Sequence, residues 1–332
     1  MSRLRGKVAV VTGGSSGLGR AAAVEFARRG AHVVLAARRA SALQETARQC
    51  KRVGGAATCV SADVTREADV ARLVAAARAP TGRIDVWVNN AGVTAFAPFE
   101  AAPFADHERV IETNLIGAMR CAHAVLPIFR RQRRGTLINV GSILSKVGQP
   151  YVPSYVVSKF GLRGLSEALR MELADEPDVQ VCTLLPYAID TPHFEEGANR
   201  VGRPAHAMAP VQSPEKVARA LVDLAERPRR ERHVPRYAVA GLALRALLPG
   251  VTERAVLHLL RAWHFGEGRE APSDGNLYEP TPRAARIHGT RPPRIRFPAL
   301  VAWLAGDLAR SLLGPPPAPP RRRPRRVRTA SA

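Results

Sequence analysis

The chain has 332 residues, 46% of them hydrophobic, which is enough for one large α/β domain with appendages. Lys and Arg exceed Asp and Glu by 50 to 28, a net charge of +22, and twelve arginines against one aspartate from Thr281 onward carry half of that excess. Widely spaced cysteines, the lack of a long apolar run and an N-terminus without a signal-peptide pattern argue against a disulfide framework, a zinc site and a spanning helix, and predict a cytoplasmic protein with no bound metal.

Apolar runs alternate with amphipathic stretches from the N-terminus to about Pro186. The apolar runs predict strands at Val8–Val11, Val33–Ala36, Ala57–Val60, Ile84–Val88, Thr136–Val140 and Val179–Leu184. The stretches between them predict helices at Leu18–Arg29, Ala40–Arg52, Arg66–Arg78, Phe104–Arg130 and Tyr155–Leu173. Such alternation is typical of successive β-α-β units, whose right-handed crossovers place helices on both faces of the sheet. The predicted fold class is therefore α/β, a Rossmann-like doubly wound parallel sheet.

The pattern changes after Pro186. Ser213-Pro214 and Glu215 predict a helix start, with Lys216–Glu226 as the helix body. The next Leu- and Ala-rich stretches predict a helical extension that contains Val239–Leu248, Ala255–Phe265 and Ala299–Leu313. Two placements stay open, on a membrane surface or packed on the protein's own core, and the second is the default. Residues 314–332 are proline-rich and then arginine-rich, which predicts a disordered tail.

A glycine-rich segment, Thr12–Gly19, directly follows the first predicted strand and opens the first predicted helix. Glycines let the backbone turn tightly and approach a pyrophosphate without interference from a Cβ atom, and the helix N-terminus offers free N–H groups to the anion. A glycine-rich stretch alone is a weak signal. Because a strand precedes it and a helix follows it, this one predicts a dinucleotide-binding loop.

The second predicted strand ends at Arg38 and Arg39, where a fold that selects NAD usually carries an acidic residue for the ribose 2′-OH. A guanidinium instead binds a 2′-phosphate through charge-assisted hydrogen bonds, so this pair favours NADP(H), with NAD as the weaker alternative. The competing interpretation is two solvated arginines in an Arg-rich chain. Asp63 and Val64, just past the third strand, suit a contact with the adenine ring.

The fifth predicted strand leads into Ser142, and Tyr155 and Lys159 share one face of the next predicted helix. A free phenol holds its proton until about pH 10, and a nearby ammonium brings that proton within reach of transfer near neutrality. Ser142 is placed to hydrogen-bond a substrate oxygen. A lone Tyr-x-x-x-Lys is an ordinary helix face, but with this serine on a nucleotide-binding fold it predicts hydride transfer between a nicotinamide and a carbonyl or secondary alcohol.

In these motifs the chain resembles the short-chain dehydrogenase/reductase family over roughly residues 5–195. Thr12–Gly19 matches the family's TGxxxGxG loop, Asn89–Gly92 its NNAG segment, and its catalytic tetrad is matched by Asn114, Ser142, Tyr155 and Lys159. The resemblance implies that Tyr155 is the general acid/base and that Lys159 lowers the phenol's pKa and binds the nicotinamide ribose. It also implies a water-linked proton relay at Asn114 and substrate orientation by Ser142.

The motifs and the resemblance together define a predicted cofactor site, whose residues are Gly13, Ser15, Ser16, Gly17, Leu18, Gly19, Arg38, Arg39, Asp63, Val64, Asn90, Ala91, Gly92, Tyr155, Lys159, Pro186, Ile189 and Thr191. Pro186-Tyr187 replaces the family's Pro-Gly, and Tyr187 either narrows the pocket or is a surface aromatic. The domains implied are a catalytic domain over residues 1–235, a helical extension over 236–313 and a tail over 314–332. Family members commonly pair their two long helices, which implies a homodimer or homotetramer.

The substrate side carries little signal, because Tyr187–Pro210 is mixed in character. An apolar pocket for a lipid, steroid or polyketide-like carbonyl stays open, and so does a site for a sugar or an acyl-thioester. One alternative function is a non-catalytic regulatory or scaffold protein that keeps the nucleotide site, although the complete tetrad argues against it. Another is an enzyme, peripheral to the membrane or bound to nucleic acid, that is anchored through Arg321–Arg328.

Overall fold

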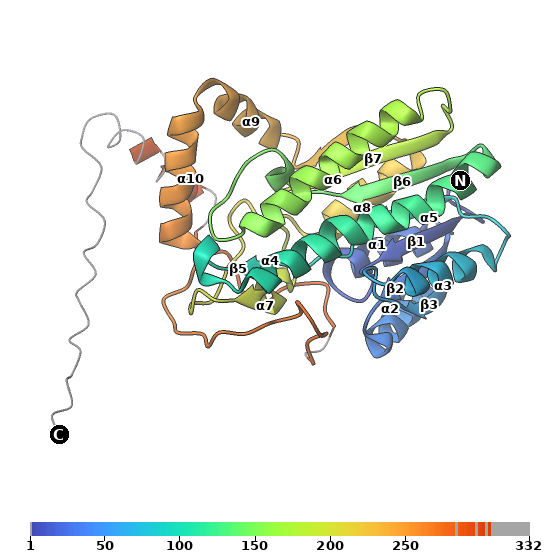
Figure 1. The fold of residues 1–332 in the computed structure, drawn as a ribbon, viewed down its shortest axis with the longest axis horizontal. Coiled ribbons are helices and arrows are strands. Elements are labelled where there is room, and N and C mark those ends of the chain that lie inside the picture. The colour runs from blue at the N-terminus through green and yellow to red at the C-terminus, as the bar shows by residue number, and fades with distance from the viewer. Residues whose placement is uncertain (1, 283–284, 296–297, 303–304, 307–332) are drawn as a thin grey trace.

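The computed structural model describes residues 2–282, 285–295, 298–302 and 305–306, and its main feature is a large parallel sheet flanked by helices (Figure 1). The sheet has seven strands in the order β3-β2-β1-β4-β6-β7-β9. Their bounds are β1 Val8–Thr12, β2 His32–Ala37, β3 Ala56–Ser61, β4 Val86–Asn89, β6 Gly135–Val140, β7 Val179–Pro186 and β9 Glu231–Val234. The predicted doubly wound α/β fold is confirmed. The sequence did not reveal β9, because this edge strand reads Glu-Arg-His-Val and buries only its last residue.

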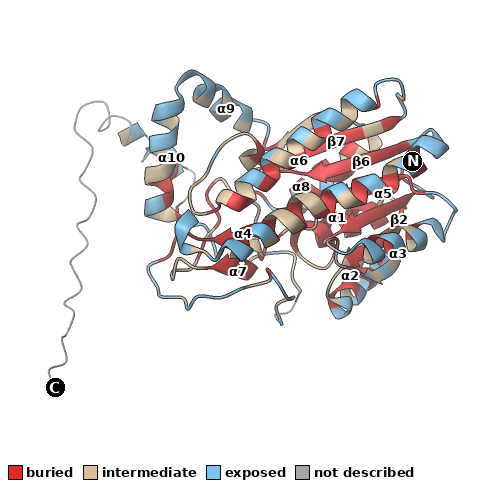
Figure 2. Cartoon of the chain, in the orientation of Figure 1, coloured by how far each residue is buried: buried red, intermediate tan, exposed pale blue. Residues whose placement is uncertain are grey.

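Helices cover both faces of the sheet, because successive residues of each strand point to opposite sides. Val8 and Val10 pack with α3 (Glu67–Arg78) and α5 (Gly117–Gln132) on one face, whereas Ala9 and Val11 pack with three helices on the other face, α1 (Gly17–Arg28), α2 (Ala40–Arg52) and α8 (Pro214–Glu226). Figure 2 shows the inner strands of the sheet as largely buried, whereas the edge strand β3 buries none of its residues. The core therefore consists of two apolar layers, one on each side of the sheet.

The long helix predicted over Phe104–Arg130 is formed by three consecutive helical segments. These are α4 (Phe104–Ile111), a five-residue π-helical turn at Glu112–Ile116, and α5. Single π turns inside α-helices occur frequently at functional sites. Here the turn contains Asn114. The neighbouring long helix, α6 (Pro153–Glu172), carries Tyr155 and Lys159.

The C-terminal extension begins with a helical hairpin, α9 (Ala238–Leu247) and α10 (Pro249–Trp263). α10 packs Leu259 and Leu260 against Met208 and Ala209, whereas α9 buries none of its residues. Residues 298–302 and 305–306 are helical; the rest of the helix predicted at Ala299–Leu313 and the predicted tail over 314–332 lie outside the described residues. Within the described part of the chain, no helix is both long and apolar enough to cross a bilayer.

A second C-terminal segment, residues 273–282 and 285–291, is called the strap below. It begins beside a small two-stranded sheet, β5 (Ala95–Phe96) and β8 (Ala198–Asn199), where Ser273 and Asn199 exchange two backbone hydrogen bonds. It then runs back along the lower edge of the molecule toward α2, seen as the orange-red trace in Figure 1. The strap thereby brings a C-terminal segment back to the ends of the first two strands, before the chain returns to α10 at Ile295 and Leu300.

Candidate active site

A cavity of about 390 Å³ lies at the carboxyl edge of the sheet. It is centred where the strand order reverses, with β1 followed by β2 on one side and by β4 on the other. Ligands of open α/β sheets bind at such a point. Of the site residues predicted from the sequence, all line this cavity except Asn114. The fold therefore brings the glycine-rich loop, the arginine pair and the Tyr–Lys pair together around one space.

The glycine-rich loop between β1 and α1 has no room for side chains at its glycines. Gly13 has φ +66° and Gly17 has φ +51°, in the left-handed region that favours glycine. A Cβ atom on Gly13 would lie 2.9 Å from the Ala91 Cα, and one on Gly19 would lie 2.5 Å from the Asn90 Nδ2. The loop is thus a close-fitting backbone cradle at a helix N-terminus, the kind of surface that accepts a pyrophosphate.

The arginine pair at the end of β2 faces the strap. Arg38 donates from its guanidinium to the carbonyl oxygens of Asn276 and Tyr278, the latter at 2.6 Å, and Arg39 donates to the Thr281 carbonyl at 2.6 Å. Both arginines still line the cavity. A guanidinium has five N–H donors, so Arg38 reaches the strap while keeping donors for a further acceptor.

Asp63 lines the cavity beyond the end of β3, where the sequence predicts an adenine contact. Its carboxylate pairs with Arg109 at 3.0 Å and accepts hydrogen bonds from the backbone N–H and the hydroxyl of Thr65. These bonds hold the pKa of Asp63 below its ordinary value although burial opposes them. The charge of Asp63 is therefore compensated within the protein.

Ser142, Tyr155 and Lys159 converge on one wall of the cavity. Ser142 caps a short 3-10 turn, Ile143–Ser145, by accepting from the Leu144 N–H at 3.1 Å, and this capping fixes its side chain. The Ser142 side chain acts on the Tyr155 phenol in the direction that lowers its pKa. The Lys159 Nζ donates to the Val140 carbonyl at 2.8 Å and lies 5.4 Å from the centre of the Tyr155 ring. β6 and α6 together therefore set this cluster.

The Tyr155 pKa departs from its ordinary value in the direction opposite to the sequence-based expectation. Burial raises the pKa of Tyr155 to about 12, which outweighs the opposing effect of the Ser142 hydrogen bond. Burial also lowers the pKa of Lys159 to about 8. Desolvation disfavours the charged form of both groups. In this geometry the Lys159 amine faces the Val140 carbonyl, and burial sets the direction in which the phenol's pKa moves.

Asn114 lies one layer behind the cavity wall and is 1% exposed. Its amide exchanges two hydrogen bonds with the backbone of Val93, at 2.8 and 2.9 Å, and donates to the Ser158 hydroxyl at 3.2 Å. Ser158 in turn donates to the Tyr155 carbonyl at 2.7 Å. Asn114 thus fastens the loop after β4 to the helix that carries Tyr155.

Other residues at the substrate end of the cavity carry no role in the sequence motifs. His193, at the start of α7 (His193–Glu196), has its ring centre 5.6 Å from that of Tyr155, and burial lowers its pKa to about 4. Tyr187 lines the cavity and is not a surface aromatic. Much of the remaining wall is apolar or aromatic and includes Phe96, Val152, Phe194, Met208, Val256, Leu259, Leu260 and His264. Four of these residues come from the C-terminal extension: Val256, Leu259 and Leu260 on α10, and His264 directly after it. No local sequence pattern predicts this contribution to the cavity wall.

The comparison with protein families matches residues 7–201 to the short chain dehydrogenase model. The uncharacterized oxidoreductase YxnA of Bacillus subtilis is 36% identical over 277 residues, which cover 82% of this chain and 77% of that protein. Because the match covers 82% of this chain, it must extend past Trp263, where α10 ends. The 3beta-hydroxysteroid dehydrogenase 1 of Eggerthella lenta is 36% identical over 229 residues, covering 67% of this chain and 87% of that protein.

A solved structure shares the fold described above. It is an alcohol dehydrogenase from the archaeon Thermococcus sibiricus, in complex with 5-hydroxy-NADP, with a TM-score of 0.60 and 29% identity over 68% of this chain and 95% of that one. The family match covers more than half of the chain and contains the glycine-rich loop and the Ser–Tyr–Lys cluster. The chain therefore belongs to the short-chain dehydrogenase family, and it is an oxidoreductase that acts on CH–OH or C=O groups with NAD(P).

Proposed function

We propose that this protein is an NADP(H)-dependent oxidoreductase that interconverts a carbonyl and a secondary alcohol, with Tyr155 as the general acid/base. The observation that carries the proposal is the cluster of Ser142, Tyr155 and Lys159 on the wall of a cavity that also contains the glycine-rich cradle. A proton donor and a dinucleotide-binding loop in one cavity are the two parts that carbonyl reduction needs.

The residues present fit a dinucleotide. The tight loop at Gly13, Gly17 and Gly19 requires glycine, because a Cβ atom at these positions would strain the loop or press on its neighbours. Such a loop at a helix N-terminus is the typical binding site of a pyrophosphate. Arg38 and Arg39 offer guanidinium groups for a 2′-phosphate, and neither position carries the carboxylate that would repel it. Pro186, Ile189 and Thr191, between β7 and α7, would hold the nicotinamide end.

When bound, the nicotinamide supplies the hydride for reduction or accepts it for oxidation. In the reductive direction Tyr155 donates its phenolic proton to the substrate oxygen while the carbonyl carbon gains the hydride. Burial keeps this phenol protonated at neutral pH, so its proton is present for transfer, and positive charge nearby would favour the release of that proton. Ser142 hydrogen-bonds the same oxygen and orients it, and Lys159, held by the Val140 carbonyl, supplies positive charge beside the phenolate that is left.

The substrate end of the cavity favours an apolar compound. Phe96, Phe194, Leu259 and Leu260 contribute apolar surface there, and the pKa of His193 is low enough to leave this side chain neutral at pH 7. We therefore propose a small apolar ketone or secondary alcohol as the substrate.

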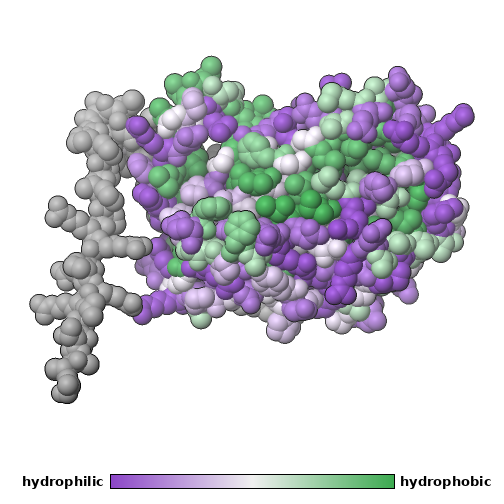
Figure 3. All heavy atoms as spheres, viewed as in Figure 1, coloured by the Kyte–Doolittle hydropathy of each residue, from purple (hydrophilic) through white to green (hydrophobic). Residues whose placement is uncertain are grey.

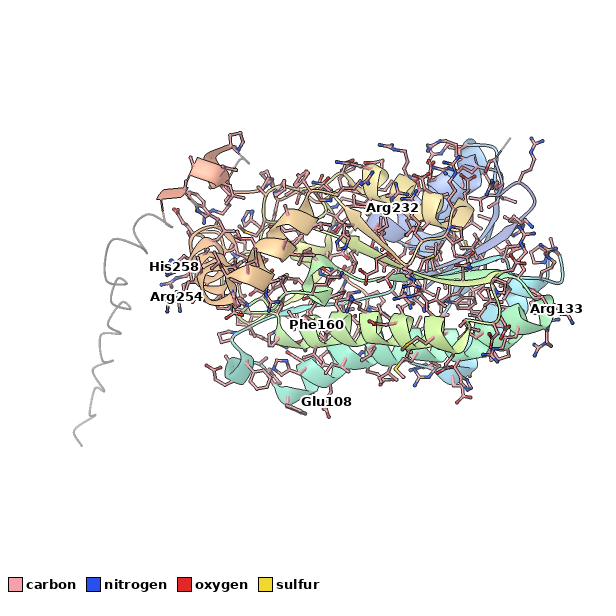
Figure 4. All side chains as sticks on the ribbon, turned by 90° about the horizontal axis from the view of Figure 1, so that it is seen from above. Glu108, Arg133, Phe160, Arg232, Arg254 and His258 are labelled. Atoms are coloured by element: carbon pink, nitrogen blue, oxygen red, sulfur yellow. The ribbon has the colours of Figure 1, made fainter. Side chains whose placement is uncertain are left out.

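We also retain the homo-oligomer as part of the proposal. The two long helices expose large apolar side chains, Met119 on α5 and Val157 and Phe160 on α6, the last of which is labelled in Figure 4. Such side chains suit the pairing of two copies through these helices.

The direct test replaces the proposed acid. Tyr155→Phe removes the phenolic proton and leaves the ring, so turnover should fall by about 10²–10⁴-fold or more while NADPH binding stays unchanged. Turnover is read from the nicotinamide absorbance over a panel of ketones and alcohols, and binding from NADPH fluorescence. Tyr151→Phe removes a hydroxyl from a nearby aromatic and serves as the control. Appreciable activity in Tyr155→Phe overturns the assignment, and nucleotide binding without turnover in the wild type across the panel supports the scaffold alternative.

A further inference from the structure

The outer side of the α9–α10 hairpin is apolar. Six large side chains there are exposed and form what we call the hairpin patch, made of Val239, Leu244, Leu247, Leu248, Val251 and Val256. Leu247 is 78% exposed and Leu244 is 52% exposed. Figure 3 shows apolar surface at the edge of the molecule where Figure 1 places α9. Single exposed leucines are common on protein surfaces, but six large exposed apolar side chains on one helical hairpin indicate an interaction site.

The helix that carries half of this patch, α9, packs only lightly against α10 and β9, with Ala238, Leu242 and Arg245 half-buried. α9 reads Ala-Val-Ala-Gly-Leu-Ala-Leu-Arg-Ala-Leu and none of its residues is buried. Because an isolated ten-residue helix is marginal in water, a helix of this length is stable only when it packs on something. Leu247 and Leu248 lie at the turn into α10, so the tip of the hairpin is itself apolar.

The segment that forms the hairpin carries an excess of positive charge. The segment from Arg236 to Trp263 contains four arginines and a single acidic residue, Glu253. Figure 4 shows Arg254 pointing outward from α10, together with His258. The sequence of residues 307–332, beyond the described part of the chain, adds seven arginines and one aspartate. An apolar surface with arginines nearby is complementary to an anionic lipid surface. Leucine side chains bury among the acyl chains, and guanidinium groups pair with the anionic headgroups.

We propose that the α9–α10 hairpin docks this enzyme on an anionic lipid bilayer through the hairpin patch, with the cavity opening beside the docked surface. Val256 belongs to both features, because it is 36% exposed and lines the cavity, while Leu259 and Leu260 on the same helix face the cavity interior. An apolar substrate dissolved in the bilayer therefore has a short apolar route into the site. The docking itself does not depend on the reaction proposed above.

A second copy of the chain fits this patch less well. A symmetric pair would bring the patch against itself and place its arginines near their own counterparts, a like-charge arrangement that disfavours the contact. The exposed apolar side chains of α5 and α6 already provide a separate surface for an oligomer. The bilayer is therefore the occupant to which the charge pattern points.

The test is co-sedimentation of the full-length protein with vesicles of phosphatidylcholine, with and without phosphatidylglycerol, at low and high salt. We expect binding to the anionic vesicles, reduced but not abolished by salt. Leu244→Glu/Leu247→Glu should weaken that binding by about tenfold or more, because two apolar side chains are replaced by carboxylates. Arg254→Gln/Arg261→Gln should lose about tenfold on anionic vesicles only, since each arginine near such a surface contributes modestly.

The control is Met171→Glu, which puts one glutamate on an exposed apolar position near the C-terminal end of α6 and should leave vesicle binding unchanged. Because α9 buries none of its residues, the double glutamate variant should keep the wild-type melting temperature and nucleotide binding. Wild-type binding in that variant would assign the attachment to the arginines of residues 307–332 and overturn the proposal. The proposal would also be overturned if the wild-type protein did not bind vesicles. Light scattering that showed a smaller assembly for the double glutamate variant would then assign the hairpin patch to an oligomeric contact.

Discussion

The two sides of the nucleotide cleft are built in opposite ways. One side is the glycine-rich loop, whose shape follows from residue types within the eight positions Thr12–Gly19. The other side is the strap, which reaches the cleft from far along the chain, since the Asn276 carbonyl that accepts from Arg38 lies 238 residues later. The loop depends on which side chains are absent, whereas the strap uses backbone carbonyls, which every residue has. A local pattern therefore reveals the first and conceals the second.

The strap is fastened at several points around the cleft. The Gly17 N–H, at the start of α1, donates to the Arg286 carbonyl at 2.8 Å. Glu195 accepts from the Thr290 hydroxyl at 2.9 Å and pairs with Arg286 at 2.7 Å. His288 lies between Asp190 and Glu215, at 2.9 Å from each, and these carboxylates raise its pKa. The segment after β7 and the helix that carries the loop are thus tied to the same C-terminal residues.

The largest effect is expected at the loop. In Gly19→Ala the new Cβ would press on the Gly13 carbonyl and the Asn90 side chain, so the cradle must open and nucleotide binding should be lost. Gly164→Ala, in the middle of α6 with nothing within 4 Å of its Cβ, is the control and should stabilise the fold by about 0.5–1 kcal/mol. Binding is measured by NADPH fluorescence and stability by denaturant titration. Normal binding in Gly19→Ala would show that the loop is not the nucleotide cradle.

An intermediate effect is expected where loop and strap meet. Arg38→Ala removes a donor that faces both the cavity and the strap, so NADPH affinity should fall by about 10–100-fold through the lost charge-assisted bonds to the 2′-phosphate. NADH affinity should fall far less, because NADH has no 2′-phosphate and is affected only by the loss of the hydrogen bonds between Arg38 and the strap. Isothermal titration with both nucleotides separates the two contributions. Equal losses for NADPH and NADH would contradict the NADP(H) preference and assign Arg38 to the strap alone.

The smallest effect concerns the C-terminal wall of the cavity and depends on pH. Burial lowers the pKa of His264 to about 4, whereas an unfolded histidine titrates at its ordinary 6.5. Between these values the unfolded state binds a proton that the folded state does not, so stability falls as pH falls through this window. For one such histidine the loss between about pH 7 and pH 5 is about 2 kcal/mol.

His264→Phe should remove this share of the acid sensitivity, because Phe96 and Phe265 already pack against the ring and an aromatic can replace it. His193, whose pKa is also about 4, should keep its own share in the variant. Urea unfolding of both proteins near pH 7 and pH 5 gives the two differences. An identical pH dependence would mean that His264 is reached by water in the folded protein.

Much of the site was predictable because its parts are local. Tyr155 and Lys159 lie one helical turn apart, and Ser142 follows a strand of six buried residues. The wall contributed by α10 was not predictable, since Val256 and Leu260 reach the cavity only because α10 packs on Met208. β9 was missed for a related reason, because an edge strand needs no continuous apolar run. The direction in which the Tyr155 pKa shifts was also not predictable, because it depends on how deeply the phenol is buried, and helical spacing does not reveal burial.

The sequence by itself determined the doubly wound sheet, the glycine loop and the spacing of the proposed proton donor, because each rests on side-chain periodicity or on residue types a few positions apart. The tertiary structure alone decided what closes the cleft and what faces the substrate. Carbonyl groups of the strap and the inner face of α10 act through their position in space, and that position is fixed by packing between segments that are distant in the chain.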